Sequence, residues 1–301
     1  MPDRRSRSRR GPRAPAAEAA QLPEGPVAID TGWVELVRDR STPGAVTVLV
    51  NGVPSSHVEL DDPTWLEFEY MQQMAAVVDV LPPGPLDAVH LGAGACSLPR
   101  WLEARRPGSR QIAVDVDAAL LTLVRTWFDL PRSPRLRLRP GDARTRLTEL
   151  PDSSADLVVR DVFAGDRTPS DLATHQFVEE VARVLRPGGV YLANCADRPP
   201  LDLARAEMAT IRSVLPSAAL VSEPGMLRGR RYGNLVLIGT RPGPRDLDLA
   251  DAGLARTLRS LPVPTRLLRG PELDAFVKSA APMTDPPGTQ RSSGAGSGNE
   301  A

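Results

Sequence analysis

The sequence predicts an α/β protein built on a mostly parallel sheet, because glycine or acidic residues follow several predicted strands. The apolar segment Asp87–Leu91 runs into the glycine turn Gly92–Gly94. A second apolar segment, Ile112–Val114, ends at Asp115 after an intervening helical stretch. The order strand, glycine turn, helix, strand and acidic end is typical of a β-α-β unit. We therefore expect a ligand site at the carboxyl ends of these strands.

The glycine turn and Asp115 together predict a nucleoside site. Gly92 and Gly94 allow a sharp turn and a close approach of the backbone to a ligand. The carboxylate of Asp115 can accept hydrogen bonds from two vicinal ribose hydroxyls. Ser97 stands where the dinucleotide fingerprint has its third glycine, so an adenosyl group such as that of S-adenosylmethionine is favoured over NAD or FAD. The alternative is a tight turn followed by an acidic residue that merely ends its strand.

A third strand end predicts the adenine side of the site. The alternating segment Arg135–Leu138 runs into Gly141, Asp142 and Ala143. A carboxylate beside a small residue could receive the exocyclic amine and the face of an adenine ring.

Two further strands complete the parallel part of the sheet. The segment Ala155–Asp161 predicts a buried fourth strand with Asp161 at its carboxyl end, facing the reacting centre. A helical segment, Val181–Leu185, is stopped by Arg186–Gly189, and the fifth strand is expected at Val190–Asn194.

The segments before and after this sheet have their own patterns. Val27–Leu60 predicts a small antiparallel sheet with a turn at Asn51–Gly52. Asp61 or Asp62 then caps a helix that begins at Pro63.

The patterns as a whole divide the chain into six expected parts. An antiparallel last strand is expected near Gly233–Thr240, followed by one or two helices. The parts are a disordered basic tail (1–25), an antiparallel β-hairpin subdomain (26–62), a linking helix (63–83), a Rossmann nucleoside-binding domain (84–243), a C-terminal helical extension (244–281) and a disordered tail (282–301).

Composition excludes several classes of protein. The chain has 301 residues, 41% of them hydrophobic, and a formal net charge of zero, which argues against a polyanionic partner for the whole molecule. No apolar run approaches the about 20 residues of a membrane span. The basic segment Arg4–Arg13 lacks a following apolar signal core, so we expect a cytoplasmic protein. We interpret that segment as a solvated tail, with nucleic-acid binding as the alternative.

Cysteine and histidine usage predicts neither a disulfide framework nor a metal site. Cys96 and Cys195 are the only cysteines, and both are expected to be reduced. His57, His90 and His175 are scattered along the chain without metal-ligand spacing.

In this order, the motifs resemble the spermidine synthase-like proteins of the class I methyltransferase-type Rossmann superfamily. The resemblance spans Gly32 to Asp285. It includes the N-terminal hairpin around Thr47–His57 and the helix around Phe68–Met74. The glycine turn, Val114–Asp117, Gly141–Ala143 and Asp161–Asp166 follow in the same order as in that family.

The resemblance implies a fold, a cofactor and site residues. The implied fold is a mostly parallel seven-stranded sheet with an antiparallel last strand, preceded by the N-terminal subdomain. S-adenosylmethionine or its decarboxylated form is the implied co-substrate, without a metal, and the acceptor is a small molecule such as an amine. A homodimer is left open. The implied site comprises catalytic Asp161 and Tyr70, and cofactor-binding Gly92, Ala93, Gly94, Asp115, Asp142 and Ala143.

Three departures from the family pattern remove negative charge. Ala95 replaces an acidic residue of the glycine turn, and Ala164 replaces an aspartate three residues after Asp161. Gln72 replaces the glutamate of a tyrosine–glutamate pair that begins with Tyr70. The expected function is therefore either methyl or aminopropyl transfer to an acceptor other than a diamine, or adenosyl-ligand binding by a scaffold that has lost the chemistry.

Overall fold

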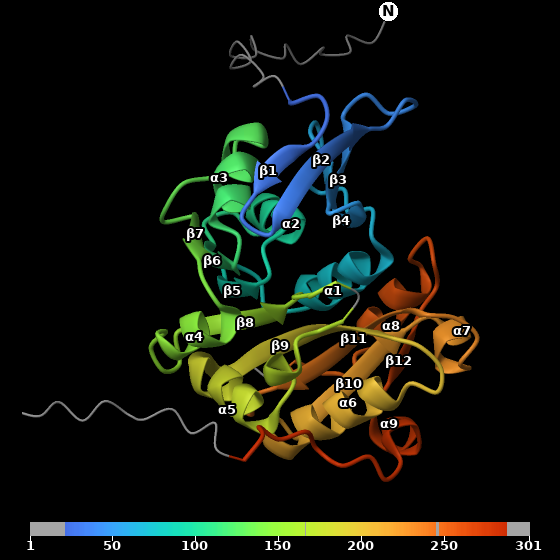
Figure 1. Cartoon of the computed structure of the whole chain (residues 1–301). Helices are drawn as coiled ribbons and strands as arrows, with labels where there is room; N and C mark the ends of the chain where they lie inside the picture. Colours follow the sequence, from blue (N-terminus) through green and yellow to red (C-terminus); the bar gives the residue numbers. More distant parts are fainter. Residues whose placement is uncertain (1–21, 166, 245–246, 288–301) are drawn as a thin grey trace, which may run out of the picture.

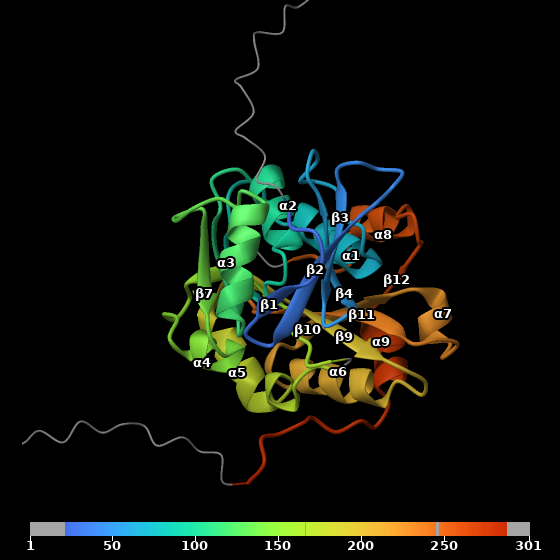
Figure 2. The same cartoon turned by 45° about the horizontal axis from the view of Figure 1, so that its top comes forward.

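Two β-sheets dominate the structure, a computed structural model that describes residues 22–165, 167–244 and 247–287. A four-stranded antiparallel sheet is formed by the first strands of the chain, and an eight-stranded sheet by the others. The small sheet stands above the large one in Figure 1 and in front of it in Figure 2. The strands of the small sheet are β1 Val27–Ile29, β2 Gly32–Arg38, β3 Ala45–Val50 and β4 Val53–Glu59.

The large sheet has the predicted mostly parallel arrangement. Its order is β12-β10-β11-β9-β8-β5-β6-β7, in which β5 to β9 are parallel and β11 is antiparallel to β9. Its strands are β5 Asp87–Leu91, β6 Arg110–Asp115, β7 Leu136–Pro140, β8 Ala155–Arg160, β9 Leu185–Asp197, β10 Ser217–Ser222, β11 Gly233–Thr240 and β12 Arg266–Leu268. The seven expected strands are thus joined by an eighth, β12, which pairs with β10 at the edge.

Helices cover both faces of the large sheet and create separate apolar cores. On one face, α4, α5, α6 and α9 pack against β8, β9 and β11. On the other, α1, α2 and α8 pack against β5, β8 and β11, while α3 packs under the small sheet. The helices are α1 Glu69–Asp79, α2 Ser97–Arg105, α3 Ala118–Trp127, α4 Ala143–Thr148, α5 His175–Val184, α6 Asp202–Val214, α7 Pro224–Leu227, α8 Ala252–Arg259 and α9 Gly270–Val277, with a 3₁₀ turn η1 at Ser170–Leu172. None of these helices combines the length and the apolar character that crossing a membrane requires.

The small sheet is fastened to the large sheet through polar contacts near strand ends. The backbone N–H and the hydroxyl of Thr31 both donate to Asp117 Oδ2 at 2.8 Å. The backbone N–H of Ala95 donates to Ser56 Oγ of β4 at 2.9 Å. The small sheet therefore forms a wall above the carboxyl ends of β5 and β6.

The linking helix begins later than the sequence predicted. Helix α1 starts at Glu69, not at Pro63. Asp62 does not cap a helix, because its Oδ1 accepts hydrogen bonds from Thr64 N at 2.8 Å and from Thr64 Oγ1 at 2.6 Å. A local turn of this kind competes with helix formation, so the residues between Asp62 and Phe68 form a connection instead.

The fifth parallel strand is longer than the sequence predicted. Strand β9 starts at Leu185, directly after α5, and the expected helix stop at Arg186–Gly189 lies within it. The backbone N–H of Gly188 donates to the Arg241 carbonyl at 2.8 Å, and the backbone N–H of Arg241 donates to the Gly189 carbonyl at 2.9 Å. Pairing with the chain after β11 thus extends the strand across a sequence that alone signals a helix end.

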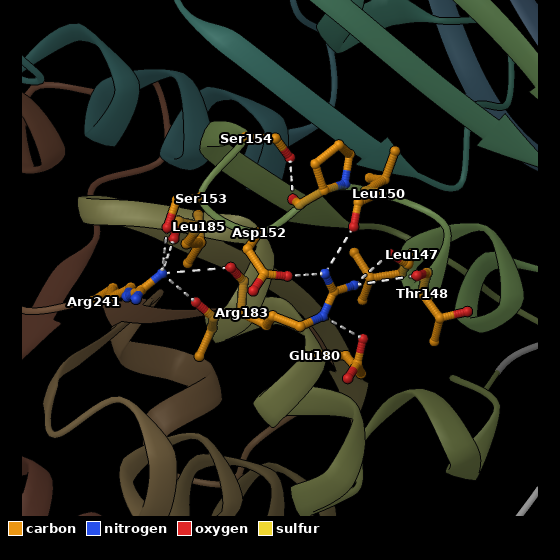
Figure 3. A network of polar contacts seen from close by, with 12 residues as sticks. Leu147, Thr148, Leu150, Asp152, Ser153, Ser154, Glu180, Arg183, Leu185 and Arg241 are labelled. Atoms are coloured by element: carbon orange, nitrogen blue, oxygen red, sulfur yellow. Dashed lines mark hydrogen bonds and ion pairs between the residues drawn. The ribbon is translucent and has the colours of Figure 1, made fainter. Parts of the chain in front are cut away.

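Two arginines fix the loop that enters β8 (Figure 3). Because β5 and β8 are parallel, this loop lies at the end of the sheet opposite the glycine turn. Arg183 Nη1 donates to the Leu150 carbonyl at 2.8 Å and to Asp152 Oδ1 at 2.6 Å. Arg241 Nη1 donates to Ser153 Oγ at 3.1 Å. These contacts hold the start of β8 against α5 and the end of β11. They thereby fix the position of β8 and of its carboxyl end.

The first residues of the expected C-terminal tail contact the helices of the fold. His175 N donates to the Met283 carbonyl at 2.8 Å, and Met283 N donates to Thr210 Oγ1 at 2.8 Å. Asp285 forms a two-bond ion pair with Arg144, at 2.8 and 2.5 Å. Residues 282–287 thus bind to α4, α5 and α6. The rest of that tail, and the Arg4–Arg13 segment, lie outside the described residues.

We expect the Arg144–Asp285 pair to stabilise the fold by about 1 kcal/mol, since both side chains are mostly buried and the contact is bidentate. A double-mutant cycle with Arg144→Met and Asp285→Asn, followed by denaturant unfolding, measures this coupling. Arg144 lowers the pKa of Asp285, so the contribution is present at neutral pH and is lost as the pH falls through that lowered pKa. A coupling energy near zero at pH 7 would contradict the assignment.

Candidate active site at the carboxyl edge of the sheet

A cavity of about 1610 Å³ opens where the parallel strands end and the small sheet covers them. All eight residues that the sequence singled out as catalytic or cofactor-binding line this cavity: Tyr70, Gly92, Ala93, Gly94, Asp115, Asp142, Ala143 and Asp161. The topology brings them together because the carboxyl ends of neighbouring parallel strands meet at one edge.

The first glycine of the turn is required by space and by backbone conformation. Gly92 has φ = 88°, and a Cβ at this position would lie 2.0 Å from the Asp161 carbonyl oxygen. Gly92 N donates to the Val114 carbonyl at 2.9 Å, and Asp161 N donates to the Leu91 carbonyl at 2.7 Å. The ends of β5, β6 and β8 therefore approach one another at a point where only glycine fits.

Asp115 holds the glycine turn from the end of β6. Its Oδ2 accepts hydrogen bonds from the backbone N–H groups of Ala93 and Gly94 at 3.1 Å, and its Oδ1 from Asp117 N at 3.1 Å. Burial raises the pKa of Asp115, although these bonds oppose the rise. Oδ2 already accepts two bonds and Oδ1 one, so Oδ1 has a remaining acceptor position for a ribose hydroxyl.

The expected adenine side is an apolar surface beside a helix start. Asp142 Oδ1 accepts bonds from Thr145 N and Thr145 Oγ1, both at 2.8 Å, and thereby caps α4. Ala143 is buried against the core, while Val116 lines the cavity and is 65% exposed. Asp142 is thus a helix cap as well as a cavity residue, and an exposed apolar side chain faces the same space.

The other end of the cavity centres on Asp161. Tyr70 Oη donates to Asp161 Oδ2 at 2.9 Å, and Asn194 Nδ2 donates to Asp161 Oδ1 at 2.8 Å. Burial raises the pKa of Asp161, while the two hydrogen bonds and the nearby Arg160 charge oppose the rise. Burial and the Asp161 charge raise the pKa of Tyr70 well above its usual value. Tyr70 therefore acts as a hydrogen-bond donor, and Asp161 is a carboxylate with increased basicity.

A buried ion pair lies directly under Asp161. Arg160 is fully buried and pairs with Glu207 of α6, which is also buried. Arg160 Nη2 also donates to the Asn194 carbonyl at 2.8 Å. This contact fixes β9 at Asn194 relative to β8, and with it the position of the Asn194 amide.

Two amide side chains of the cavity were not identified from the sequence. Asn194 lies on β9, three residues before that strand ends at Asp197, and Gln73 lies on α1 one turn after Tyr70; both line the cavity. Gln72, which replaces the family glutamate, instead donates to the Leu66 carbonyl at 2.7 Å and does not line the cavity. The one sequence signal for Gln73 was its position three residues after Tyr70, which places both residues on the same face of a helix.

The mouth of the cavity carries a charged triad of two carboxylates and one guanidinium. Arg231 Nη2 lies 3.5 Å from Glu69 Oε2 and forms a hydrogen-bonded ion pair with Glu223. All three residues line the cavity. The triad joins the start of α1 to α7 and to the segment that enters β11.

The alanines that replace family carboxylates have different positions. Ala95 is fully buried beneath Ser56 and does not line the cavity. Ala164 lines the cavity and donates its N–H to the Arg167 carbonyl at 2.8 Å. Asp166, the nearby off-register aspartate, lies outside the described residues.

In the described part of the chain, no group of three or more His, Cys, Asp or Glu residues is placed to hold a metal ion. The described cysteines and histidines therefore do not form a metal centre. Cys96 and Cys195 are free and buried, and burial raises the pKa of Cys96 to about 12. His90 is buried, with its Nε2 3.0 Å from Gln111 Oε1, and burial lowers its pKa to about 4.

Comparison with known proteins identifies the class that this fold and site define. Residues 89–193 match a methyltransferase domain family. Human methyltransferase-like protein 13, solved in complex with SAH, is 23% identical, with a TM-score of 0.51, over 67% of this chain and 95% of that chain. That likeness shows the fold alone, which is the methyltransferase-type α/β fold expected from the sequence.

The family is shown by a more similar structure. A probable spermidine synthase from Corynebacterium glutamicum is 35% identical, with a TM-score of 0.82, and the match covers 90% of this chain and 99% of that one. The chain belongs to the spermidine synthase-like family. A polyamine aminopropyltransferase from Chromobacterium violaceum is 26% identical over 139 residues, which is 46% of this chain and 53% of that protein. The chain spans between 26% and 53% of the length of the first curated relatives that it matches.

We expect Gly92→Ala to abolish adenosyl-ligand binding and to destabilise the fold by about 3 kcal/mol or more, because the new methyl group meets the Asp161 carbonyl. Gly84→Ala is the matched control, since Gly84 also has a positive φ but no atom lies within 4 Å of a Cβ placed there. The control should cost only the backbone strain, about 1–2 kcal/mol. If denaturant unfolding showed that Gly92→Ala and Gly84→Ala lower the free energy of unfolding equally, the close approach at Gly92 would be unimportant.

Proposed function

We propose that this protein is a transferase that binds S-adenosylmethionine or its decarboxylated form and transfers a methyl or aminopropyl group to a small amine. The observation that carries the proposal is the Asp161 carboxylate, which Tyr70 and Asn194 hold in the same cavity as the glycine turn and Asp115. A family of aminopropyltransferases and a fold shared with methyltransferases support the same class of reaction.

The donor half of the proposal rests on the shape of the turn. An adenosyl group would place its ribose on Asp115, its adenine between Val116 and Ala143, and its sulfonium toward Asp161. The human relative of this fold that was solved with SAH supports a ligand of this type. The residues present also fit it, because a glycine turn, a carboxylate and an apolar surface line the same cavity.

The acceptor half of the proposal gives Asp161 the role of proton acceptor. The amine nitrogen attacks the carbon next to the sulfonium, and a C–N bond forms as the C–S bond breaks. The electron pair of the C–S bond passes to sulfur, which leaves as a neutral thioether. The proton lost by nitrogen passes to Asp161, whose raised pKa suits that transfer.

The test separates donor binding from turnover. Asp115→Ala should weaken binding of S-adenosylmethionine, decarboxylated S-adenosylmethionine and methylthioadenosine by on the order of 2–3 kcal/mol, because the carboxylate that would accept a ribose hydroxyl and that holds the glycine turn is lost. Asp161→Asn should keep donor binding in calorimetry and lose product formation in mass spectrometry. Donor binding without turnover by the parent protein would instead identify an adenosyl-binding scaffold, and no binding at all would refute the site.

A pH profile tests the pairing of Tyr70 with Asp161. The hydrogen bond from Tyr70 favours the ionised carboxylate and so lowers the pKa of Asp161. In Tyr70→Phe that pKa rises further, and the acid limb of kcat/KM should move to higher pH. Tyr232→Phe, at the cavity mouth, should leave the position of the acid limb unchanged. A shift to lower pH in Tyr70→Phe would contradict the assignment.

A further inference from the structure

The end of β8 carries a charged side chain where an apolar one is expected. Arg160 lies on the same face of the strand as Val158, and both side chains are fully buried. Val158 belongs to the apolar core that the sheet forms with α5 and α6. A buried ion pair gives little net stability compared with apolar side chains of similar volume. Stability alone therefore does not account for a guanidinium directly before Asp161.

The Arg160 guanidinium contacts three elements that surround Asp161. Its Nη2 donates to the Asn194 carbonyl of β9 at 2.8 Å, and its Nη1 to the Leu172 carbonyl of η1 at 3.4 Å. Its ion pair with Glu207 reaches α6. Asn194 and Leu172 both line the cavity. One side chain thus holds two parts of the cavity wall to the strand end that carries the catalytic carboxylate.

The guanidinium also acts on Asp161 through its charge. Burial raises the pKa of Asp161, and the hydrogen bonds from Asn194 and Tyr70 and the positive charge of Arg160 oppose that rise. Glu207 is paired with the same guanidinium and offsets part of its charge. Burial raises the pKa of Glu207, and the charge of Arg160 opposes this rise as well. The ionisation of the two carboxylates is therefore linked through one guanidinium.

Other titratable groups near the ion pair lie on β9 and α1. Burial raises the pKa of Tyr191 and that of Cys195 on β9, so both groups are neutral at neutral pH. Asp197, also on β9, disfavours the ionised form of Glu207. Burial raises the pKa of Tyr70 on α1 well above its usual value. The phenols and the thiol therefore add no charge beside the buried ion pair.

We propose that Arg160 is a positioning residue for the transfer, which holds Asn194 and η1 against the end of β8 and whose charge, partly offset by Glu207, favours the ionised Asp161 that accepts the proton. This inference rests on the proposed function, because it assigns the support of the same catalytic carboxylate. Arg160 acts from the α6 side of the strand end, through the residues that line the cavity.

The experiment removes each charge of the pair in turn and follows the titration of Asp161. NMR of the full chain, labelled with a carbon isotope at the aspartate carboxyl groups, records the pKa, and Asp161→Asn identifies the resonance. In Arg160→Met the loss of a positive charge should raise the pKa of Asp161. In Glu207→Gln the amide oxygen can still accept a bond from Arg160, but the loss of a negative charge should lower that pKa.

The direction of the two shifts distinguishes charge from packing. A loss of packing common to both variants would move the pKa of Asp161 in the same direction in each. Binding of methylthioadenosine, measured by calorimetry, should stay as in the parent, because the ion pair does not line the cavity. If Arg160→Met does not fold, the double variant Arg160→Met/Glu207→Gln replaces it, since it leaves neither charge of the pair buried. The pKa should rise there too, because the charge next to Asp161 is lost.

Arg144→Met is the matched control for the contact with η1. Arg144 Nη1 donates to the Asp171 carbonyl at 2.9 Å, which directly precedes the carbonyl that Arg160 holds. Its charge is not among those that act on Asp161. The control should loosen η1 in hydrogen exchange, as Arg160→Met does, but leave the pKa of Asp161 as in the parent.

The outcomes separate this inference from the proposed function. Shifts in the same direction, the absence of a shift in one of the two variants, or an equal shift in Arg144→Met would overturn the inference even if the parent transfers a group. Product formation with either donor is scored separately. Its absence, with the opposite shifts intact, would contradict the proposed transfer and leave the support of Asp161 by Arg160 standing.

Discussion

The buried guanidinium of Arg160 is the constraint on which the floor of the cavity depends. A charge in the protein interior costs several kcal/mol unless it is paired and fully hydrogen-bonded. Arg160, the last residue of β8, is paired with Glu207 of α6 and donates to the Asn194 and Leu172 carbonyls, while its Nε has no hydrogen-bond partner among the described residues. Those partners come from three different elements. The charge is therefore tolerated only while α6, the end of β9 and η1 keep one arrangement around β8.

That arrangement determines the chemistry of the next residue. Successive residues of a strand point to opposite faces, so Arg160 turns toward α6 while Asp161 turns toward α1 and meets Tyr70. The guanidinium favours the ionised form of Asp161, but burial opposes it more strongly, and the pKa rises. The same ion pair thus anchors the strand end and moderates the basicity of the carboxylate. A scaffold without chemistry would gain nothing from a buried charge placed to support another buried charge.

The sequence predicted the parts of the site that depend on local signals. Gly92, Asp115 and Asp161 each follow a recognisable strand, and parallel pairing alone brings such strand ends to one edge. The rest depends on contacts that no local pattern reveals. Glu207 is 47 residues beyond Arg160 and appears in the sequence as an ordinary helix residue. The start of α1 was misplaced because Asp62 and Thr64 form a turn that resembles a cap. Strand β12 was missed because three residues at a sheet edge carry too short a pattern.

The departures from the family pattern acquire a physical meaning only in three dimensions. Of the three positions that lost a carboxylate, Ala95 and Gln72 do not line the cavity. Ala164 does line it, together with the carboxylates of Glu67, Glu69, Asp171 and Glu223, and Arg231 pairs with Glu69 and Glu223. A sulfonium donor already brings one positive charge to Asp161, and an ammonium would bring a second. Position 164 is therefore the one departure that lowers the negative charge of the cavity itself, and these cations would have to be balanced by Asp161 and by the carboxylates that remain.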